Sequence, residues 1–320
     1  MHGQRHEKPL STGLGMLMVA MTLIGWSSVP LFLRYFAQHI DVWTSNGWRY
    51  GASACFWGPV LIIVALRGAW PSGLWRAALV PSAINACGQV LFAWAHYQIE
   101  PGLLTFGLRS QIIFAAIGAY WLFPSERAVI RSPGYLCGAI LVILGTSGAV
   151  LGTRDPVDFG HLTGVGLAVG SGLLFALYGL SVRKYMRGIN SVLAFAAISQ
   201  FTALVMVALM LAFGERQGMQ AWDLSREQFV WLFISALIGI ALGHVFYYMS
   251  IARLGVAVSA GVLQLQPFFV GIASYLVFSE VLTAAQWLSG AAAVSGAVLM
   301  LGVQWAVSRK NRSSAMDGKP

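Results

Sequence analysis

Charged residues are scarce in this chain. Asp, Glu, Lys and Arg together make up 10% of its 320 residues, whereas a soluble protein carries about a quarter. The scarcity excludes an ordinary soluble domain, because such a domain needs charged side chains to cover its surface. The sequence also has no nucleotide-binding, metal-binding or haem-binding motif, so we expect no cofactor and no metal.

Cysteine is rare as well, with three residues in the whole chain. Cys55, Cys87 and Cys137 each stand alone inside an apolar stretch, without the CxxC or Cys/His spacing of a metal site. We therefore expect these side chains to pack between helices rather than to form disulfides or to hold a metal.

Apolar sequence is abundant: 58% of the residues are hydrophobic and 36 are glycine. A helix needs about 20 mostly apolar residues to cross a bilayer. We expect an all-α integral membrane protein with ten transmembrane helices, at 14–37, 44–66, 75–98, 101–123, 134–151, 162–185, 192–213, 229–252, 256–278 and 284–306. No small-residue cleavage site closes the first run, so we expect an uncleaved helix rather than a signal peptide.

Lysine and arginine fall unevenly on the two sides that these spans define. One side holds both termini and 14 positive residues: Arg5, Lys8, Arg67, Arg76, Arg127, Arg131, Arg183, Lys184, Arg187, Arg253, Arg309, Lys310, Arg312 and Lys319. The other side holds three, Arg154, Arg216 and Arg226. Because positive loops stay in the cytoplasm, we expect both termini there, in the cell inner (plasma) membrane. The net charge of +9 then reflects topology, and no nucleic-acid partner is expected.

Residues 95–126 and 249–280 indicate an internal duplication. Aligned without a gap, they share six identities in 32 positions: Gly107/Gly261, Phe114/Phe268, Ala119/Ala273, Leu122/Leu276, Ser125/Ser279 and Glu126/Glu280. Five helices in each half is an odd number, so the halves must run in opposite directions through the membrane. We expect two inverted five-helix repeats, at 14–153 and 160–306, between cytoplasmic tails at 1–13 and 307–320.

Short motifs in both halves resemble the EamA family of the drug/metabolite transporter (DMT) superfamily. The second half carries Gln266-Pro267, Ser279-Glu280 and Gln286-Trp287-x-x-Gly290, a pattern similar to the second repeat of that family. In the first half, Gly25-Trp26-Ser27 resembles the motif of the first helix, and Glu126-Arg127 matches the other copy of the Ser-Glu end.

The resemblance covers about residues 14–305. It implies ten helices in an inverted five-plus-five repeat, with a central cavity lined mainly by helices 1, 3, 4, 6, 8 and 9. The chain departs from the family pattern in the first copy, where Ile113 stands in place of Pro267 and Arg109-Ser110-Gln111 replaces a stretch that is usually apolar. This departure puts strict symmetry of the site in doubt and suggests where specificity lies.

Arg109 is the most unusual polar residue in the predicted spans. Counting from Pro101 at about 1.5 Å per residue places it about 12 Å deep, near the middle of the hydrocarbon layer. No Asp or Glu lies within any predicted span, so no counter-ion is evident. Arg109 either bonds backbone carbonyls or a tyrosine, or it faces the cavity and binds a substrate carboxylate or phosphate.

Two prolines predict exposed backbone acceptors. Pro267 cannot donate a hydrogen bond to the carbonyl of Leu263, and Pro30 cannot donate one to the carbonyl of Trp26. Paired broken helices near mid-membrane are one way to build a polar site. Kinks that only aid packing are the alternative.

Further candidates follow from helix faces. Asn85 and Gln89 lie on one polar face of the third span, either as contacts between helices or as cavity lining. Gln264 and Gln266 are about 200° apart on a helix, so we select only the first for the cavity. The predicted substrate-binding residues are Trp26, Asn85, Gln89, Trp94, Arg109, Tyr178, His244, Tyr248 and Gln264. Tyr248 could alternatively belong to the interfacial aromatic belt. Arg34 and Arg49 are expected to extend toward the headgroups.

The function that best explains the duplication is secondary transport by alternating access. We expect an exporter of small organic metabolites, such as amino acids or related anionic or zwitterionic compounds, with a drug or toxic-compound efflux protein of the same superfamily as an alternative. Without an intramembrane carboxylate, we expect facilitated diffusion or exchange, or weak proton coupling through His244. The expected partners are a small-molecule substrate and the lipid bilayer, and a homodimer is left open.

An intramembrane hydrolase of the serine type is the alternative from another class. Gly51-Ala52-Ser53-Ala54 and Gly145-Thr146-Ser147-Gly148 match a short GxSx pattern. Such matches are expected by chance in a chain rich in these residues, so we expect no enzyme. A channel is disfavoured because no charged ring or filter-like carbonyl loop is evident.

Overall fold

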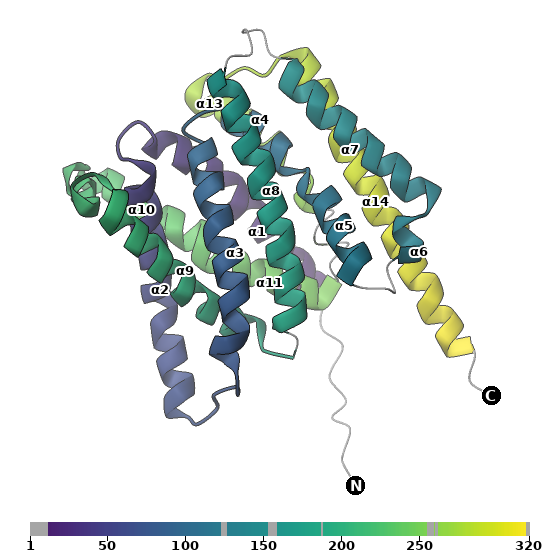
Figure 1. The fold of residues 1–320 in the computed structure, drawn as a ribbon, viewed down its shortest axis with the longest axis horizontal. Coiled ribbons are helices and arrows are strands. Elements are labelled where there is room, and N and C mark those ends of the chain that lie inside the picture. The colour runs from purple at the N-terminus through teal and green to yellow at the C-terminus, as the bar shows by residue number, and fades with distance from the viewer. Residues whose placement is uncertain are drawn as a thin grey trace.

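The computed structural model describes residues 12–122, 127–152, 159–186, 188–254, 259 and 262–317. Within these ranges the chain is helical, with turns between the helices and no strand, which confirms the all-α prediction (Figure 1). The expected N-terminal tail lies almost entirely outside the described residues. Residues 123–126, 153–158 and 255–258 also lie outside them.

The helices follow the predicted apolar stretches. The first half contains α1 (Thr12–Phe36), α2 (Val42–Leu66), α3 (Leu74–Ala95), α4 (Pro101–Leu108), α5 (Gln111–Leu122), α6 (Arg127–Ile130) and α7 (Pro133–Leu151). The second half contains α8 (Phe159–Tyr185), α9 (Ser191–Phe213), η2 (Glu215–Asp223), α10 (Arg226–Ser235), η3 (Ala236–Leu242), α11 (Gly243–Leu254), α13 (Gln266–Phe278) and α14 (Ala284–Asp317).

Seven helical stretches of the described chain are long and apolar enough to cross a membrane. Three shorter apolar helices accompany them, at Pro133–Ala149, Gln266–Phe278 and Ala284–Met300. The protein is therefore a multi-pass membrane protein. The expected number of ten spans stays a prediction, because the apolar parts of these three shorter helices fall short of the length that a span requires.

Three stretches expected as single helices are interrupted. The stretch 101–123 is broken at Arg109 and Ser110, between α4 and α5. The stretch 256–278 is broken at Gln264 and Leu265, just before α13. The stretch 229–252 passes through η3, a π-helical segment, between α10 and α11. Wider π turns occur frequently at functional positions, and η3 contains no proline that could have signalled it in the sequence.

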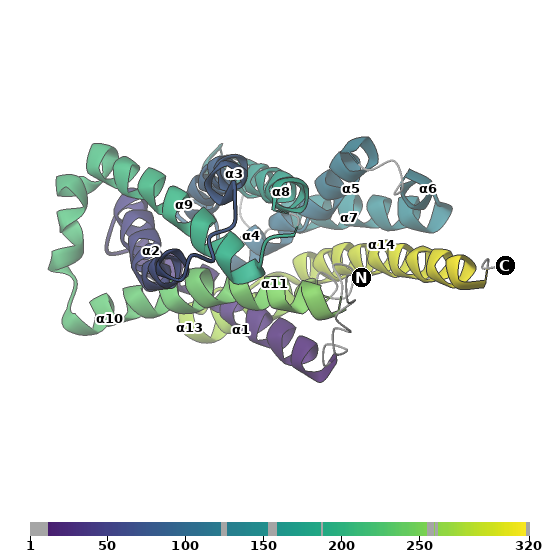
Figure 2. The ribbon, with the colours of Figure 1, turned by 90° about the horizontal axis from the view of Figure 1, so that it is seen from below.

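The helices pack in pairs that are distant in the sequence. α7 runs along α14, α3 along α8, α2 along α9 and α1 along α11. Figures 1 and 2 both show α7 and α14 side by side at one edge of the molecule. Small residues permit this contact: a Cβ added at Gly145 would stand 2.4 Å from the backbone nitrogen of Ala293.

α14 continues to Asp317, so the expected cytoplasmic tail at 307–320 is helical over most of its length. Cys55, Cys87 and Cys137 are free, as predicted, but they are exposed. Because they are exposed, these side chains do not pack between helices as expected. On the apolar outer surface of a membrane protein, a thiol can face lipid instead.

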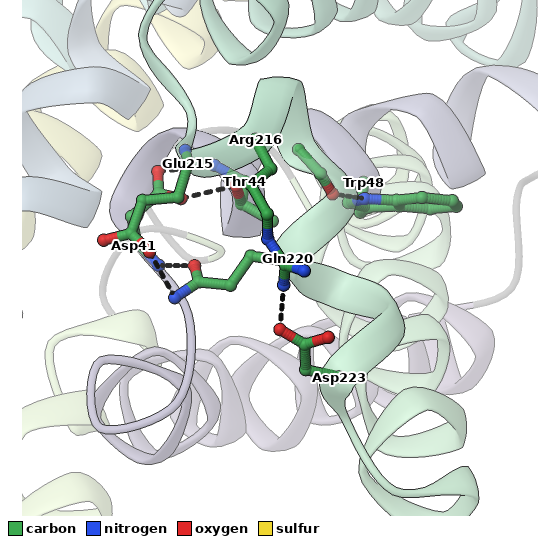
Figure 3. A network of polar contacts seen from close by, with 8 residues as sticks. Asp41, Thr44, Trp48, Glu215, Arg216, Gln220 and Asp223 are labelled. Atoms are coloured by element: carbon green, nitrogen blue, oxygen red, sulfur yellow. Dashed lines mark hydrogen bonds and ion pairs between the residues drawn. The ribbon is translucent and has the colours of Figure 1, made fainter.

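A polar network closes one end of the bundle, where α1 turns into α2 (Figure 3). Asp41 caps α2 by accepting hydrogen bonds from the backbone nitrogens of Trp43 and Thr44, at 2.8 and 2.9 Å. Its other carboxylate oxygen accepts from the backbone nitrogen of Glu215 at 3.0 Å, and its own backbone nitrogen donates to Gln220 at 2.9 Å. The single carboxylate thus joins the α1–α2 turn to η2.

Candidate functional site

Arg109 lies at the break between α4 and α5. α4 begins with Pro101 at its first position, where a missing N–H does no harm. At the break, the backbone nitrogens of Arg109 and Ser110 donate to the carbonyls three residues earlier, Phe106 and Gly107, at 3.0 and 3.1 Å. These tight turns end the regular α-helical bonding and place the Arg109 side chain between the halves of the protein.

The Arg109 guanidinium contacts the beginning of α13. Nη1 donates to the carbonyl oxygen of Leu263 at 3.0 Å, and Nη2 donates to Oε1 of Gln266 at 2.9 Å. The Leu263 carbonyl is the acceptor that Pro267 was predicted to expose. One of the three nitrogens thus makes the backbone contact that was the alternative to substrate binding, and the role of Arg109 in the cavity stays a prediction.

Gln266 extends this contact to α1. Its Nε2 donates to the carbonyl oxygen of Trp26 at 2.8 Å, which is the acceptor that Pro30 was predicted to expose. We call Arg109, Leu263, Gln266 and Trp26 the Arg109 network. In it, both carbonyls freed by proline are satisfied by side chains, so neither helix leaves a bare acceptor in the apolar interior.

The charge of Arg109 has no acidic partner in the described part of the chain. Its side chain is 7% exposed, and its Nε has no hydrogen-bond partner there. A charge at mid-bilayer costs about 2.5–3.5 kcal/mol on insertion scales. The two neutral acceptors reduce this cost without neutralising the charge, and the buried Nε is left as a donor without a partner in the described ranges.

An aromatic cluster lies beside the Arg109 network. The indole of Trp26 contacts the His244 ring edge-on at 5.2 Å and the Tyr247 ring at 5.0 Å. The other face of His244 stacks on Phe195, with centroids 4.7 Å apart. We define Trp26, Phe195, His244 and Tyr247 as the aromatic cluster.

Tyr178 and Tyr248 join the same region from α8 and α11. Their hydroxyl oxygens are 2.5 Å apart, and the Tyr248 ring contacts Phe195 edge-on at 6.2 Å. The structure therefore brings together five predicted site residues: Trp26, Arg109, Tyr178, His244 and Tyr248. Aromatic rings on one side and a spare cationic donor on the other suit a ligand with an apolar body and an acidic group.

The polar face of α3 meets other helices. Asn85 Nδ2 donates to Thr202 Oγ1 of α9 at 3.2 Å, and Gln89 Nε2 lies 3.5 Å from Asn85 Oδ1. The carbonyl of Gln89 accepts from Asn46 of α2 at 3.4 Å. These bonds correspond to the alternative in which the face holds helices together, and they do not connect Asn85 or Gln89 to the Arg109 network.

Trp94 lies apart from the Arg109 network. It is 43% exposed and its ring contacts Trp43 at 5.9 Å, so it lies at the surface rather than in the aromatic cluster. Gln264 is buried next to Leu263, and Gln266 is the glutamine that contacts Arg109. The selection of Gln264 for the cavity stays a prediction.

Arg49 does not extend toward the headgroups as expected. It is 2% exposed, and its Nε donates to Ser235 Oγ at 2.9 Å. Its side chain turns inward because another helix offers an acceptor, which a rule based on depth alone does not include. Arg34 Nε forms an ion pair with Glu280 Oε1 at 2.9 Å, and both of these side chains are partly exposed.

The serine-hydrolase alternative gains no support. Ser53 Oγ lies 3.1 Å from Ser199 Oγ, so its neighbour is a second hydroxyl rather than the histidine that would activate it. Ser147 is exposed on α7. No group of three His, Cys, Asp or Glu residues that could hold a metal ion occurs in the described ranges.

The fold and the Arg109 network define a helical, multi-pass membrane protein in which broken helices from the two halves meet at a buried cation. The model of the EamA-like transporter family matches residues 162–302. This match confirms the predicted resemblance over the second half of the chain, and it indicates a membrane transporter of the DMT type.

A solved structure described as "Crystal structure of protein" is similar to this chain, with a TM-score of 0.60 and 16% sequence identity. The similarity covers 90% of this chain and 96% of that one. At such low identity the likeness shows the fold alone. No curated protein matches the chain.

Proposed function

We propose that the protein exports small organic metabolites, such as amino acids or related anionic or zwitterionic compounds, by alternating access at the Arg109 network. The observation that carries this proposal is a buried guanidinium with a spare donor at the meeting point of two broken helices. In secondary transporters, discontinuous helices near mid-membrane bind substrate because their free backbone groups and side chains face a common centre.

The packing of the helices supports an inverted repeat. If the ten predicted spans are numbered in order, the contacting pairs include spans 1 and 8, 2 and 7, 3 and 6, 4 and 9, and 5 and 10, together with 4 and 6, 1 and 9, 3 and 7, and 2 and 8. Each span can be replaced by its counterpart in the other half, so that span 1 becomes span 6, span 2 becomes span 7, and span 6 becomes span 1. This exchange gives the same set of pairs again. Such invariance is what a two-fold relation between two five-helix repeats requires.

We also propose that both termini lie in the cytoplasm and that the protein resides in the cell inner membrane. The Asp41 network then lies on the outer side, and the loops rich in Lys and Arg lie inside. Single cysteines introduced near residues 10 and 310, labelled from either side, test this topology. Labelling of the two ends from opposite sides would contradict the ten-span inverted arrangement.

The function itself is tested in two steps. Metabolite profiling of a deletion strain and an overexpressing strain identifies the compounds whose export depends on the protein. Purified protein in proteoliposomes then transports the identified compound, with and without an imposed pH gradient. The lack of an acid in the predicted spans supports facilitated diffusion or exchange. A strong gradient dependence that survives His244→Gln would contradict it.

A further inference from the structure

Arg49 is a second buried cation, in the first third of α2. Its Nε donates to Ser235 Oγ at 2.9 Å, and Ser235 Oγ in turn donates to the carbonyl of Leu232 at 2.7 Å. The hydroxyl is therefore a neutral acceptor that is already engaged with its own helix. The Arg49 Nη2 atom has no hydrogen-bond partner within the described ranges.

The charge of Arg49 is not neutralised by any described acidic residue. The ion pairs of the described chain join Arg34 to Glu280 and Arg216 to Asp223. A guanidinium keeps its charge in proteins, so a 2% exposed side chain without a carboxylate is an unusual feature. Arg49 matches Arg109 in this respect, and Arg34 does not.

Arg49 and Trp26 meet at Gly239, inside the π-helical segment η3. The carbonyl of Gly239 accepts a hydrogen bond from Trp26 Nε1 at 3.1 Å. A Cβ atom placed on Gly239 would stand 3.8 Å from Arg49 Nη2, so the unpartnered nitrogen lies against this glycine. The indole of Trp26 and the free end of Arg49 thus border the same turn.

Trp26 is therefore connected to both cations. Through its backbone carbonyl it is connected to Gln266 and so to Arg109. Through its indole it borders the turn on which Arg49 lies. Each of the two cations has a buried nitrogen without a hydrogen-bond partner in the described part of the chain.

We infer that the substrate is a small organic dianion, in which two acidic groups are joined by a short apolar body. One acidic group binds Arg109 and the other binds Arg49, while the body packs against Trp26. The inference rests on the proposed function for the role of Arg109 and adds Arg49 as the residue that selects a second oxyanion. A dianion balances both charges, whereas a zwitterion brings an ammonium group to a region that already holds two cations.

The test compares diacids with monoacids of matched length. The thermal stability of the purified protein is measured in detergent at pH 7.5 with succinate, glutarate and adipate, and with butyrate, valerate and hexanoate. We expect one or more diacids to stabilise the protein at a concentration at least tenfold lower than the matched monoacid. Equal concentrations for diacids and monoacids would overturn the inference and would leave the proposed function standing.

Variants of the two arginines test which guanidinium binds which acidic group of the ligand. Arg49→Gln should abolish the preference for diacids and keep the response to monoacids, and Arg109→Gln should lose both responses. Arg34→Gln is the matched control, because its cation is paired with Glu280, and it should keep the preference. Arg49→Lys keeps the charge and loses the planar fork, so it should lower the preference while preserving the fold.

A diacid preference unchanged in Arg49→Gln or, if that variant does not fold, in Arg49→Lys would overturn the role of Arg49. Normal transport of the identified compound by Arg109→Gln would instead contradict the proposed function, whatever the diacids do. Failures of the two proposals are therefore distinguishable.

Discussion

Arg109 Nη1 donates a hydrogen bond to the carbonyl oxygen of Leu263 at 3.0 Å, and the two residues take equivalent positions in the alignment of residues 95–126 with residues 249–280. Each stands 14 residues after the start of its segment, since 109 − 95 and 263 − 249 are both 14. The bond therefore joins the two aligned segments at the same point of each, and in both segments the helix is interrupted next to that point.

Arg109→Ala should abolish transport and leave membrane insertion intact. Hydrogen bonds to a charged group contribute about 1.5–3 kcal/mol, and about 1.4 kcal/mol is a factor of ten in affinity, so we expect at least a tenfold loss. Uptake into proteoliposomes measures the effect, and the amount of protein extracted from membranes serves as the control. Full transport by this variant would refute the role of Arg109 in binding.

Substitutions of Gln266 should separate folding from binding. Gln266→Leu leaves Arg109 Nη2 and the Trp26 carbonyl without partners, and each buried orphan group costs about 1–3 kcal/mol. Its melting temperature should fall together with transport. Gln266→Glu places a carboxylate beside Arg109, so it should fold normally while its fixed charge competes with an anionic substrate. Wild-type transport by Gln266→Glu would contradict anion binding at Arg109.

Asp41→Ala should destabilise the protein, because this carboxylate caps α2 and also holds η2 through Glu215. Loss of an N-cap costs about 0.5–2 kcal/mol, and the expected loss lies near the upper end. Asp223→Ala is the matched control: its ion pair with Arg216 is exposed, and exposed pairs contribute about 0–1 kcal/mol. Thermal unfolding in detergent should therefore show a clear shift for the first variant and little for the second.

Gly145→Leu should disrupt the contact between α7 and α14. A Cβ at this position would stand 2.4 Å from the carbonyl oxygen of Ser289, and this backbone atom cannot rotate away. Overpacking of this kind costs about 1–3 kcal/mol. Gly166→Leu on α8 provides the control, since no atom lies within 4 Å of an added Cβ there. Equal melting temperatures for the two variants would contradict the tight packing.

Much of the helical architecture could be predicted from apolar runs, because a bilayer imposes a length and a composition on every span. The two freed carbonyls could be predicted as well, since proline lacks the donor that a helix needs at a fixed spacing. Trp26 and Leu263 accept side-chain hydrogen bonds for this reason. Both predictions rest on local rules that need no knowledge of the neighbouring helices.

The partners of these groups could not be predicted. Gln264 and Gln266 are equal candidates by composition, and only the interruption of the helix before Gln266 determines which one reaches Arg109. From its position in the predicted span, Arg49 is expected to extend toward the headgroups. Its actual acceptor, the Ser235 hydroxyl, lies 186 positions away in the sequence and gives no local signal. Phe195, Tyr247 and Glu280 were missed as partners because aromatic rings and loop acids give no periodic signal of their own.

The two hydrogen bonds of Trp26 have a mechanical consequence. Its carbonyl is fastened to Gln266 of α13 at 2.8 Å, and its indole is fastened to Gly239 of η3 at 3.1 Å. If α1 tilts, α13 and η3 must move with it, or the hydrogen bonds that join them to Trp26 must break. Trp26→Phe removes only the second fastening, so η3 would then be free to shift its register while α1 and α13 still travel together.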